Sequence, residues 1–164
     1  DLVMCLEVIE HLPDPIFRVA IQELQRITRK WMIIGVPFKE NLRERFVRCP
    51  SCRKVFHADT HFRSFKSPEE LVALFPEFRL DKCVLGGPVS RRSTQLGLWL
   101  QQKIGGTYLS WQPHFVCFWC GFTSVDCGAQ KAEFHGRFLR RVNRWLSRFN
   151  KPLPYWLIVL LKRL

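Results

Sequence analysis

The sequence lacks any apolar stretch long enough to cross a membrane as a helix, which takes about 20 residues. Its longest apolar run, residues 155–161, has only seven. The opening residues also lack the basic and apolar segments of a secretory signal, and the chain does not begin with Met. We therefore expect a cytoplasmic protein, and we expect this chain to be a piece of a longer one.

Acidic residues are scarce as well. The 164 residues include 14 Asp and Glu against 26 Lys and Arg, which gives a formal net charge of +12. The excess is concentrated near one end, because residues 131–164 hold nine basic side chains and one acidic side chain. A basic tail more often addresses a membrane or an acidic partner than nucleic acid, whose binding surfaces spread their charge along a groove.

The first half of the chain predicts an α/β fold. Residues 1–6 and 31–36 are nearly continuous apolar runs, typical of strands buried on both faces, and the residues between them have the spacing of an amphipathic helix. A strand, a helix and a strand at this spacing predict two parallel strands joined by a right-handed crossover. A second helix is expected from Ser67 to about residue 75, followed by a third strand over residues 78–85.

Four of the seven cysteines form two Cys-x-x-Cys pairs, which predict a structural zinc site. The pairs are Cys49 with Cys52 and Cys117 with Cys120, and 64 residues separate them. Each pair resembles one half of a tetrahedral thiolate site, and Gly121 suits the tight turn of a zinc knuckle. The long separation is tolerable because the entropy of loop closure grows only logarithmically with length.

Two other interpretations of these cysteines stay open at this point. Cys49 and Cys52 could form a compact local site with His57 and His61, or the cysteines could hold no metal at all. A redox role is disfavoured because neither pair opens a helix after a strand, as the thioredoxin motif does. A disulfide framework is disfavoured by the odd number of cysteines in a chain of this length.

Residues 130–164 predict a basic amphipathic helical tail. An apolar stripe that includes Phe138, Trp145 and Phe149 alternates with arginines, and an apolar run with Tyr155 and Trp156 follows. This composition fits a helix lying on an anionic membrane, which would place the protein at the membrane periphery. It also fits a helix that docks on the sheet or on a partner chain with its arginines solvated.

Several segments of the first 85 residues together resemble class I S-adenosylmethionine-dependent methyltransferases. They are residues 1–15 (DLVMCLEVIEHLPDP), 24–27 (LQRI), 31–37 (WMIIGVP) and 61–65 (HFRSF), followed by Glu70, Phe75 and Phe78. The resemblance starts at the family's fourth strand. It implies the second half of a Rossmann-like sheet, while the family's glycine-rich Gly-x-Gly turn does not occur in this chain.

The resemblance also implies site residues. Cys5, Leu6 and Glu7 would line the S-adenosylmethionine pocket at the end of the first strand, in keeping with ligand binding beyond strand carboxyl ends. His11 would serve as a general base beside Glu10 for an oxygen acceptor. Alternatively, these two residues only shape the turn that enters the helix.

A metal-dependent methyltransferase is a further interpretation of the same residues. Glu7, Glu10 and His11 with a distal His61 are similar to the divalent-metal constellation of small-RNA 2′-O-methyltransferases and of ubiquinone-pathway O-methyltransferases. Carboxylates and imidazoles of this kind suit Mg²⁺ or Mn²⁺.

The expected organisation has three parts. Residues 1–90 form the methyltransferase half-domain with a first knuckle inserted at 48–62, residues 91–129 form an extension with the second knuckle, and residues 130–164 form the tail. The expected function is methylation of a small-molecule, saccharide or lipid-linked oxygen. The alternatives are a non-catalytic zinc-stapled interaction domain and an RNA-modifying methyltransferase.

Overall fold

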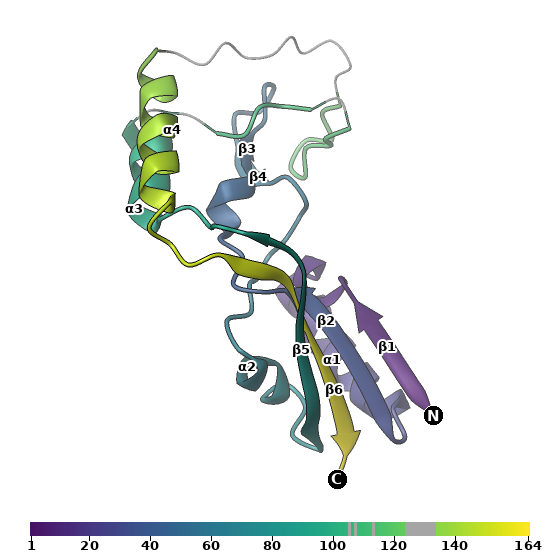
Figure 1. Ribbon diagram of the computed structural model, residues 1–164. Helices are drawn as coiled ribbons and strands as arrows, with labels where there is room; N and C mark the ends of the chain where they lie inside the picture. Colours follow the sequence, from purple (N-terminus) through teal and green to yellow (C-terminus); the bar gives the residue numbers. More distant parts are fainter. Residues whose placement is uncertain (105, 107, 113, 124–133) are drawn as a thin grey trace. The chain divides into compact units, whose positions relative to one another are not determined.

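The computed structural model describes residues 1–164 apart from 105, 107, 113 and 124–133, together with the side chains of 134–137. Two compact units are built from interleaved segments of the chain (Figure 1). Unit 1 comprises Asp1–Glu40, His61–Ser90 and Pro152–Leu164, and unit 2 comprises Asn41–Thr60 and Arg91–Lys151. The chain thus differs from the three consecutive parts expected from the sequence. Cys127 and residue 130 lie outside the described residues.

Unit 1 begins with the predicted strand–helix–strand element. Strand β1 (Leu2–Leu6) is followed by a 3-10 turn η1 (Ile9–His11), helix α1 (Asp14–Ile27) and strand β2 (Trp31–Pro37). β1 and β2 pair in parallel, with Cys5 opposite Ile34. This register places the carboxyl ends of both strands at one edge of the sheet.

The sheet is mixed, because its third member in space is the last strand of the chain. Strand β6 (Leu153–Arg163) lies antiparallel between β2 and β5 (Phe78–Ser90), so the strand order is β1-β2-β6-β5. The expectation of a helical tail reaching residue 164 is therefore wrong from Leu153 onwards. The run that suggested an interfacial segment is a central strand, since Leu157, Val159 and Leu161 have no exposed surface.

One face of this sheet carries the core of unit 1. The alternate residues Met32 and Ile34 of β2 and Leu157, Val159 and Leu161 of β6 pack with Ile21 of α1 and with Leu71 of the short helix α2 (Pro68–Val72). The sequence signal for α2 is confirmed, because the Ser67 hydroxyl accepts a hydrogen bond from the Glu70 backbone N–H.

The opposite face of the sheet is apolar but accessible. The pairing registers place Leu2 and Met4 of β1, Ile33 of β2, Leu160 of β6 and Val84 of β5 on this face. Leu2, Met4 and Val84 are each more than half exposed. Strands that pair in parallel are normally covered on both faces, so this open face is unusual for the element that β1 and β2 form.

Unit 2 has a small core of its own around the cysteine pairs. The hairpin of β3 (Phe46–Arg48) and β4 (Val55–His57) follows a 3-10 turn η2 (Leu42–Arg45). Helix α3 (Gln95–Trp99), continued by a π-helical turn η3 (Leu100–Ile104), packs beside α4 (Phe134–Ser147). Helices were expected over 91–104 and in the tail, and both exist over these shorter ranges.

Candidate functional site

The two cysteine pairs form turns of matching geometry within unit 2. In the first turn the Cys49 N–H donates to the Lys54 carbonyl at 2.9 Å and the Arg53 N–H donates to the Cys49 carbonyl at 3.1 Å. In the second turn the Cys117 N–H donates to the Phe122 carbonyl at 3.0 Å and the Gly121 N–H donates to the Cys117 carbonyl at 2.9 Å. The two turns therefore share the same pattern of backbone hydrogen bonds.

The four sulfurs converge on one point. All four Sγ atoms lie within 4.8 Å of one another, with Cys49 to Cys120 at 3.7 Å and Cys52 to Cys117 at 3.6 Å. A tetrahedral zinc ion with Zn–S distances of about 2.3 Å holds its sulfurs about 3.8 Å apart. A disulfide would need about 2.05 Å, so these spacings fit a shared ion and not a bond between sulfurs. The cluster could hold a metal ion.

The cysteine cluster is partly buried within a small aromatic core. Cys49 and Cys117 are buried together with Val47, Trp111 and Phe115, while Cys120 is exposed. The Cys52 N–H also donates to the Cys49 sulfur at 3.4 Å, a bond that stabilises a thiolate.

The protonation of Cys52 reflects this crowding. A backbone hydrogen bond at Lys54 lowers its pKa, but burial and hydrogen bonds with the other three thiols outweigh this and raise the pKa to about 11. A metal ion binds cysteines as thiolates and releases their protons, so ion binding would reverse this shift at Cys52.

The compact alternative with histidines is not the arrangement found. The metal-capable group around Cys49 and Cys52 is completed by Cys117 and Cys120, and it contains no histidine. His57 is otherwise engaged, since its Nδ1 accepts a hydrogen bond from the Asp59 N–H at 3.2 Å. The spacing of the two pairs was thus the correct guide.

A second polar cluster lies in unit 1, at the carboxyl end of β1. Glu7 ends the strand in a left-handed conformation, with φ of +53°. Such a conformation is uncommon for a residue with a side chain and often marks a functional turn. Burial raises the pKa of Glu7, while a hydrogen bond with Trp156 lowers it in part.

Glu10, in the following turn, is the most unusual carboxyl group of the described residues. Its side chain has no exposed surface, and neither oxygen has a hydrogen-bond partner among the described residues. Burial, with a smaller contribution from the charge of Glu7, raises its pKa to about 7, although the nearby polar backbone of Glu10 itself opposes the shift. A carboxyl group with this pKa can give up or take a proton near neutral pH.

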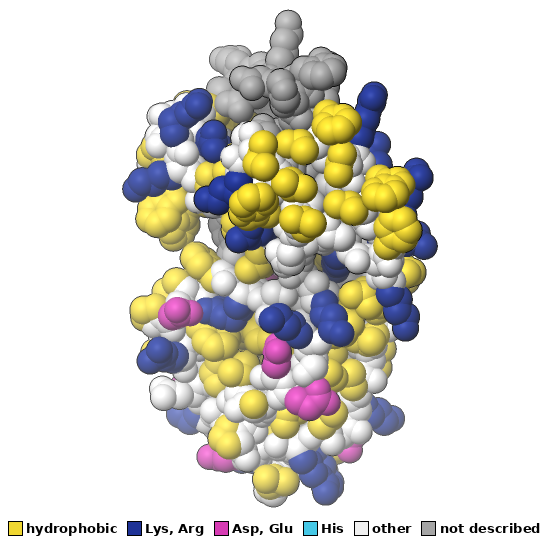
Figure 2. Space-filling view, turned by 90° about the vertical axis from the view of Figure 1, so that its left-hand side faces the viewer, with side chains coloured by type: hydrophobic (Ala, Val, Ile, Leu, Met, Phe, Trp, Pro, Cys, Tyr) yellow, Lys and Arg dark blue, Asp and Glu magenta, His cyan; other side chains and the backbone are white. Residues whose placement is uncertain are grey.

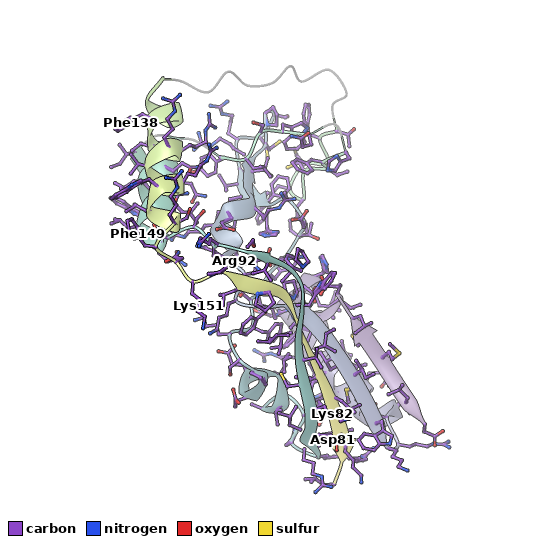
Figure 3. The ribbon with its side chains drawn as sticks, in the orientation of Figure 1. Asp81, Lys82, Arg92, Phe138, Phe149 and Lys151 are labelled. Atoms are coloured by element: carbon purple, nitrogen blue, oxygen red, sulfur yellow. The ribbon has the colours of Figure 1, made fainter. Side chains whose placement is uncertain are left out.

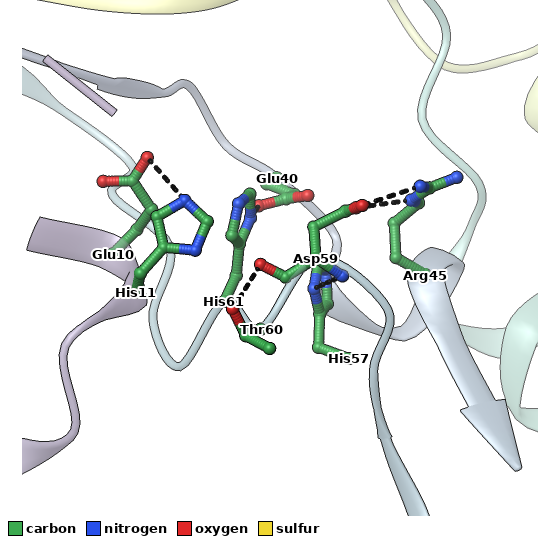
Figure 4. Close-up of polar contacts among 8 residues, drawn as sticks. All are labelled: Glu10, His11, Glu40, Arg45, His57, Asp59, Thr60 and His61. Atoms are coloured by element: carbon green, nitrogen blue, oxygen red, sulfur yellow. Dashed lines mark hydrogen bonds and ion pairs between the residues drawn. The ribbon is translucent and has the colours of Figure 1, made fainter. Parts of the chain in front are cut away.

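Two histidines lie next to this carboxyl group (Figure 4). The His11 Nε2 atom is 3.9 Å from a Glu10 oxygen, and the His11 ring meets the His61 ring edge to face at 4.5 Å between centroids. His61 Nδ1 lies 2.5 Å from a Glu40 oxygen, with both side chains almost fully buried. Ligand atoms of Glu10, His11 and His61 lie within 4.8 Å of one another, so this trio could also hold a cation.

Arg63 fixes the backbone that carries this cluster. Its guanidinium donates to the Ile9 carbonyl at 2.7 Å, to the Leu12 carbonyl, and to an Asp14 oxygen at 2.8 Å. It also lies 3.8 Å from the centre of the Phe17 ring. One side chain thereby joins η1 to the first turn of α1, and the Phe62 N–H adds a bond to the Glu10 carbonyl at 2.8 Å.

The residues expected to line a donor pocket lie in three different surroundings. Cys5 belongs to the hydrophobic core, where burial raises the pKa of its thiol. Leu6 is 43% exposed on the opposite face of the sheet, and Glu7 follows at the strand end. Their role toward a donor stays a prediction. Of the acids in the metal-dependent reading, Glu10 joins His11 and His61, whereas Glu7 is not part of that trio.

Glu40 was missed by sequence reasoning. Its place alone could have suggested it, because it follows β2 as Glu7 follows β1, and ligands of open α/β sheets bind beyond strand carboxyl ends. No protein-family model, curated protein or solved structure matches this chain.

Proposed function

We propose that this chain is the second half of an S-adenosylmethionine-dependent methyltransferase that methylates an oxygen of a small-molecule, saccharide or lipid-linked acceptor. The observation that carries the proposal is the cluster of Glu10, His11, His61 and Glu40 beyond the carboxyl ends of two parallel strands. It joins a general acid–base system to the edge where open α/β sheets bind their ligands.

The cluster supplies the proton chemistry that an oxygen acceptor needs. S-adenosylmethionine would supply an electrophilic methyl group, so the protein has only to position the hydroxyl and accept its proton. The Glu40 carboxylate accepts the Nδ1 hydrogen of His61, which leaves that imidazole with a basic Nε2. His11 contacts both this ring and Glu10. It can therefore accept the hydroxyl proton, and the neighbouring His61 and Glu10 side chains can stabilise the charge that it gains.

The open face of the unit 1 sheet supports the proposal that donor-binding elements pack against this chain. In the resemblance, further strands and helices with the glycine-rich turn come before the strand that β1 would be. Such elements would pair with the free edge of β1 and cover Leu2, Met4 and Leu6, which are all exposed apolar residues.

We also propose that the cysteine cluster holds structural zinc. Four thiolates leave no open coordination position for catalysis, and a core of this size gains stability from an ion. The ion would fasten the segment 41–60 to the segment 91–151, which are far apart in the chain.

A non-catalytic zinc-stapled scaffold is the second candidate. The aromatic core around the cysteines favours it. Trp111 packs there with Phe115 and Phe56, and none of these contacts involves the polar cluster. On this alternative Glu10 and His11 only shape the turn between β1 and α1.

The deciding experiment uses the full-length gene product that contains this chain. We expect S-adenosylmethionine to bind in calorimetric titration, and S-adenosylhomocysteine to form when hydroxylated acceptors of the three classes are supplied. His11→Gln should lower turnover about a hundredfold or more with little change in donor affinity. Glu23→Gln on the exposed side of α1 is the matched control and should change neither.

Two outcomes would contradict the proposal. A full-length protein that fails to bind the donor would leave the scaffold candidate in place. A protein that binds the donor and turns over equally well with His11→Gln would remove the assigned role of the cluster.

A further inference from the structure

Helix α4 carries a row of exposed aromatic side chains. Phe138, Trp145 and Phe149 are 59%, 55% and 74% exposed, and their spacing of seven and four residues places them along one side of the helix and its end. Trp145 and Phe149 touch edge to face at 5.1 Å between ring centroids. Figure 3 shows Phe138 and Phe149 at the two ends of this row.

A row of arginines runs beside the aromatic row. Arg141, Arg144 and Arg148 are exposed, and helical spacing places them next to the aromatic side chains and away from the packed side. The packed side is fixed by Asn143, which is buried against α3 so closely that a Cβ on Gly97 would lie 2.2 Å from its side-chain oxygen. Both exposed rows therefore belong to one outward surface.

Helix α3, which packs beside α4, and the turn after it also carry exposed apolar side chains. Leu96, Trp99 and Ile104 are 62%, 44% and 65% exposed. Figure 2 views the side on which α3 and α4 lie, and it shows hydrophobic side chains gathered among Lys and Arg side chains. We name the following residues together the aromatic–arginine surface: Phe138, Trp145, Phe149, Leu96, Trp99, Ile104, Arg141, Arg144 and Arg148.

The positive charge of unit 2 indicates which kind of partner could bind this surface. Outside residues 124–133 the unit contains only two acidic residues, Glu44 and Asp59. Both are engaged: a Glu44 oxygen accepts from the Ser93 N–H, and Asp59 pairs with Arg45 at 2.7 Å (Figure 4). A second copy of this surface would bring two arginine rows together, so self-association is disfavoured.

We propose that the aromatic–arginine surface binds the face of an anionic lipid bilayer. Aromatic side chains enter the boundary between headgroups and acyl chains, and arginines beside them pair with lipid phosphates. The surface differs from the membrane tail suggested by the sequence, because β6 belongs to the sheet of unit 1, while α3 and η3 together contribute half of the apolar residues.

The test is flotation of the chain with vesicles of phosphatidylcholine, alone or mixed with phosphatidylglycerol. We expect binding to the mixed vesicles only, and a fall in binding as salt is raised. Arg144→Gln with Arg148→Gln should weaken binding roughly twenty-fivefold, at about fivefold per arginine. Trp145→Ser with Phe149→Ser should weaken it roughly tenfold or more.

Matched controls come from unit 1. Arg18→Gln with Arg79→Gln removes the same charge, and Ile16→Ser with Val19→Ser removes exposed apolar side chains of α1. Neither pair should change binding by more than about twofold, apart from a small effect of net charge. Circular dichroism of each variant would confirm that the fold is retained.

Three results would overturn the inference. The first is an absence of binding to the anionic vesicles, and the second is equal loss of binding in the control pairs. The third is concentration-dependent dimerisation in sedimentation that Trp145→Ser with Phe149→Ser abolishes, because that would make a second copy the occupant.

Discussion

Arg53 and Gly121 occupy the same position in the two cysteine turns. Each is the fourth residue after the first cysteine of its pair, and their φ angles are +61° and +67°. A residue with a Cβ is strained in this left-handed region by about 1–2 kcal/mol, whereas glycine is not. The first turn thus carries a strain that the second avoids.

This relationship predicts opposite effects of two substitutions. Gly121→Ala should lower the free energy of unfolding by about 1 kcal/mol, and the cause can only be the backbone, since a Cβ there would meet nothing within 4 Å. Arg53→Gly should be neutral or stabilising by up to about 1 kcal/mol. Urea denaturation of the zinc-loaded protein measures both, and equal effects of the two changes would contradict the equivalence.

Metal analysis tests the cysteine cluster. We expect one zinc ion per chain in elemental analysis, with protons released when zinc is added to the metal-free protein, because bound thiols lose their hydrogens. Cys117→Ser should abolish stoichiometric zinc, and a chelator should lower the unfolding temperature. Cys83→Ser lies outside the cluster and should retain full zinc content. Zinc that persists in Cys117→Ser would rule out the four-cysteine site.

Strand β6 should behave as a core strand. Leu161→Ala removes a side chain with no exposed surface and should cost about 2–5 kcal/mol of unfolding free energy, because a cavity remains. Leu85→Ala on the edge strand β5 is the control, since that side chain is 48% exposed, and it should cost less than about 1 kcal/mol. Comparable losses would show that the last residues do not lie within the sheet.

The pH dependence of stability should report Glu10. Its pKa is raised from 4.5 to about 7, so between these values the folded state keeps a proton that the unfolded state has lost. Protonated Glu10 therefore contributes stability that is complete below pH 4.5 and is lost as the pH rises to 7. The total is up to about 3 kcal/mol.

A substitution isolates this contribution. Glu10→Gln mimics the protonated group, so the difference in unfolding free energy between this variant and the parent should grow in favour of the variant from pH 5 to pH 8. Denaturant titrations across this range measure it. The exposed Glu23→Gln should differ from the parent by a constant amount across this range, because the bond with Arg26 keeps Glu23 ionised throughout it. A constant difference for Glu10→Gln as well would mean that its carboxyl group titrates normally.

Arg63 should be more important than a surface arginine. Arg63→Ala leaves the carbonyls of Ile9 and Leu12 without their donor and should cost about 2–3 kcal/mol. Arg63→Lys should recover little, because an ammonium group cannot span the same acceptors. Arg18→Ala, an exposed position, should stay within about 0.5 kcal/mol of the parent in the same denaturation experiment.

The sequence predicted the elements that local patterns determine. The β1–α1–β2 element and the Ser67 cap follow from apolar periodicity and capping chemistry, and the cysteine cluster follows from two repeated spacings. The strand β6 was missed because seven consecutive apolar residues have no period that separates a strand from an interfacial segment.

Other features depend on contacts that no local pattern encodes. Glu40 and His61 are 21 positions apart in the chain. They meet because the chain leaves unit 1 after Glu40 and re-enters it at His61. The raised pKa of Glu10 depends on the burial of its side chain, which composition does not reveal. The face of α4 that packs on α3 likewise depends on a close approach at Gly97.

The position of β6 has a consequence for synthesis on the ribosome. β2 and β5 are each made before the strand that separates them, so neither can acquire that neighbour until residues 153–163 have left the exit tunnel. Until then β2 and β5 each have an edge with unpaired backbone N–H and C=O groups. Such edges favour aggregation or binding by chaperones. A premature stop within Arg91–Lys151, the second segment of unit 2, would leave the chain permanently in that state.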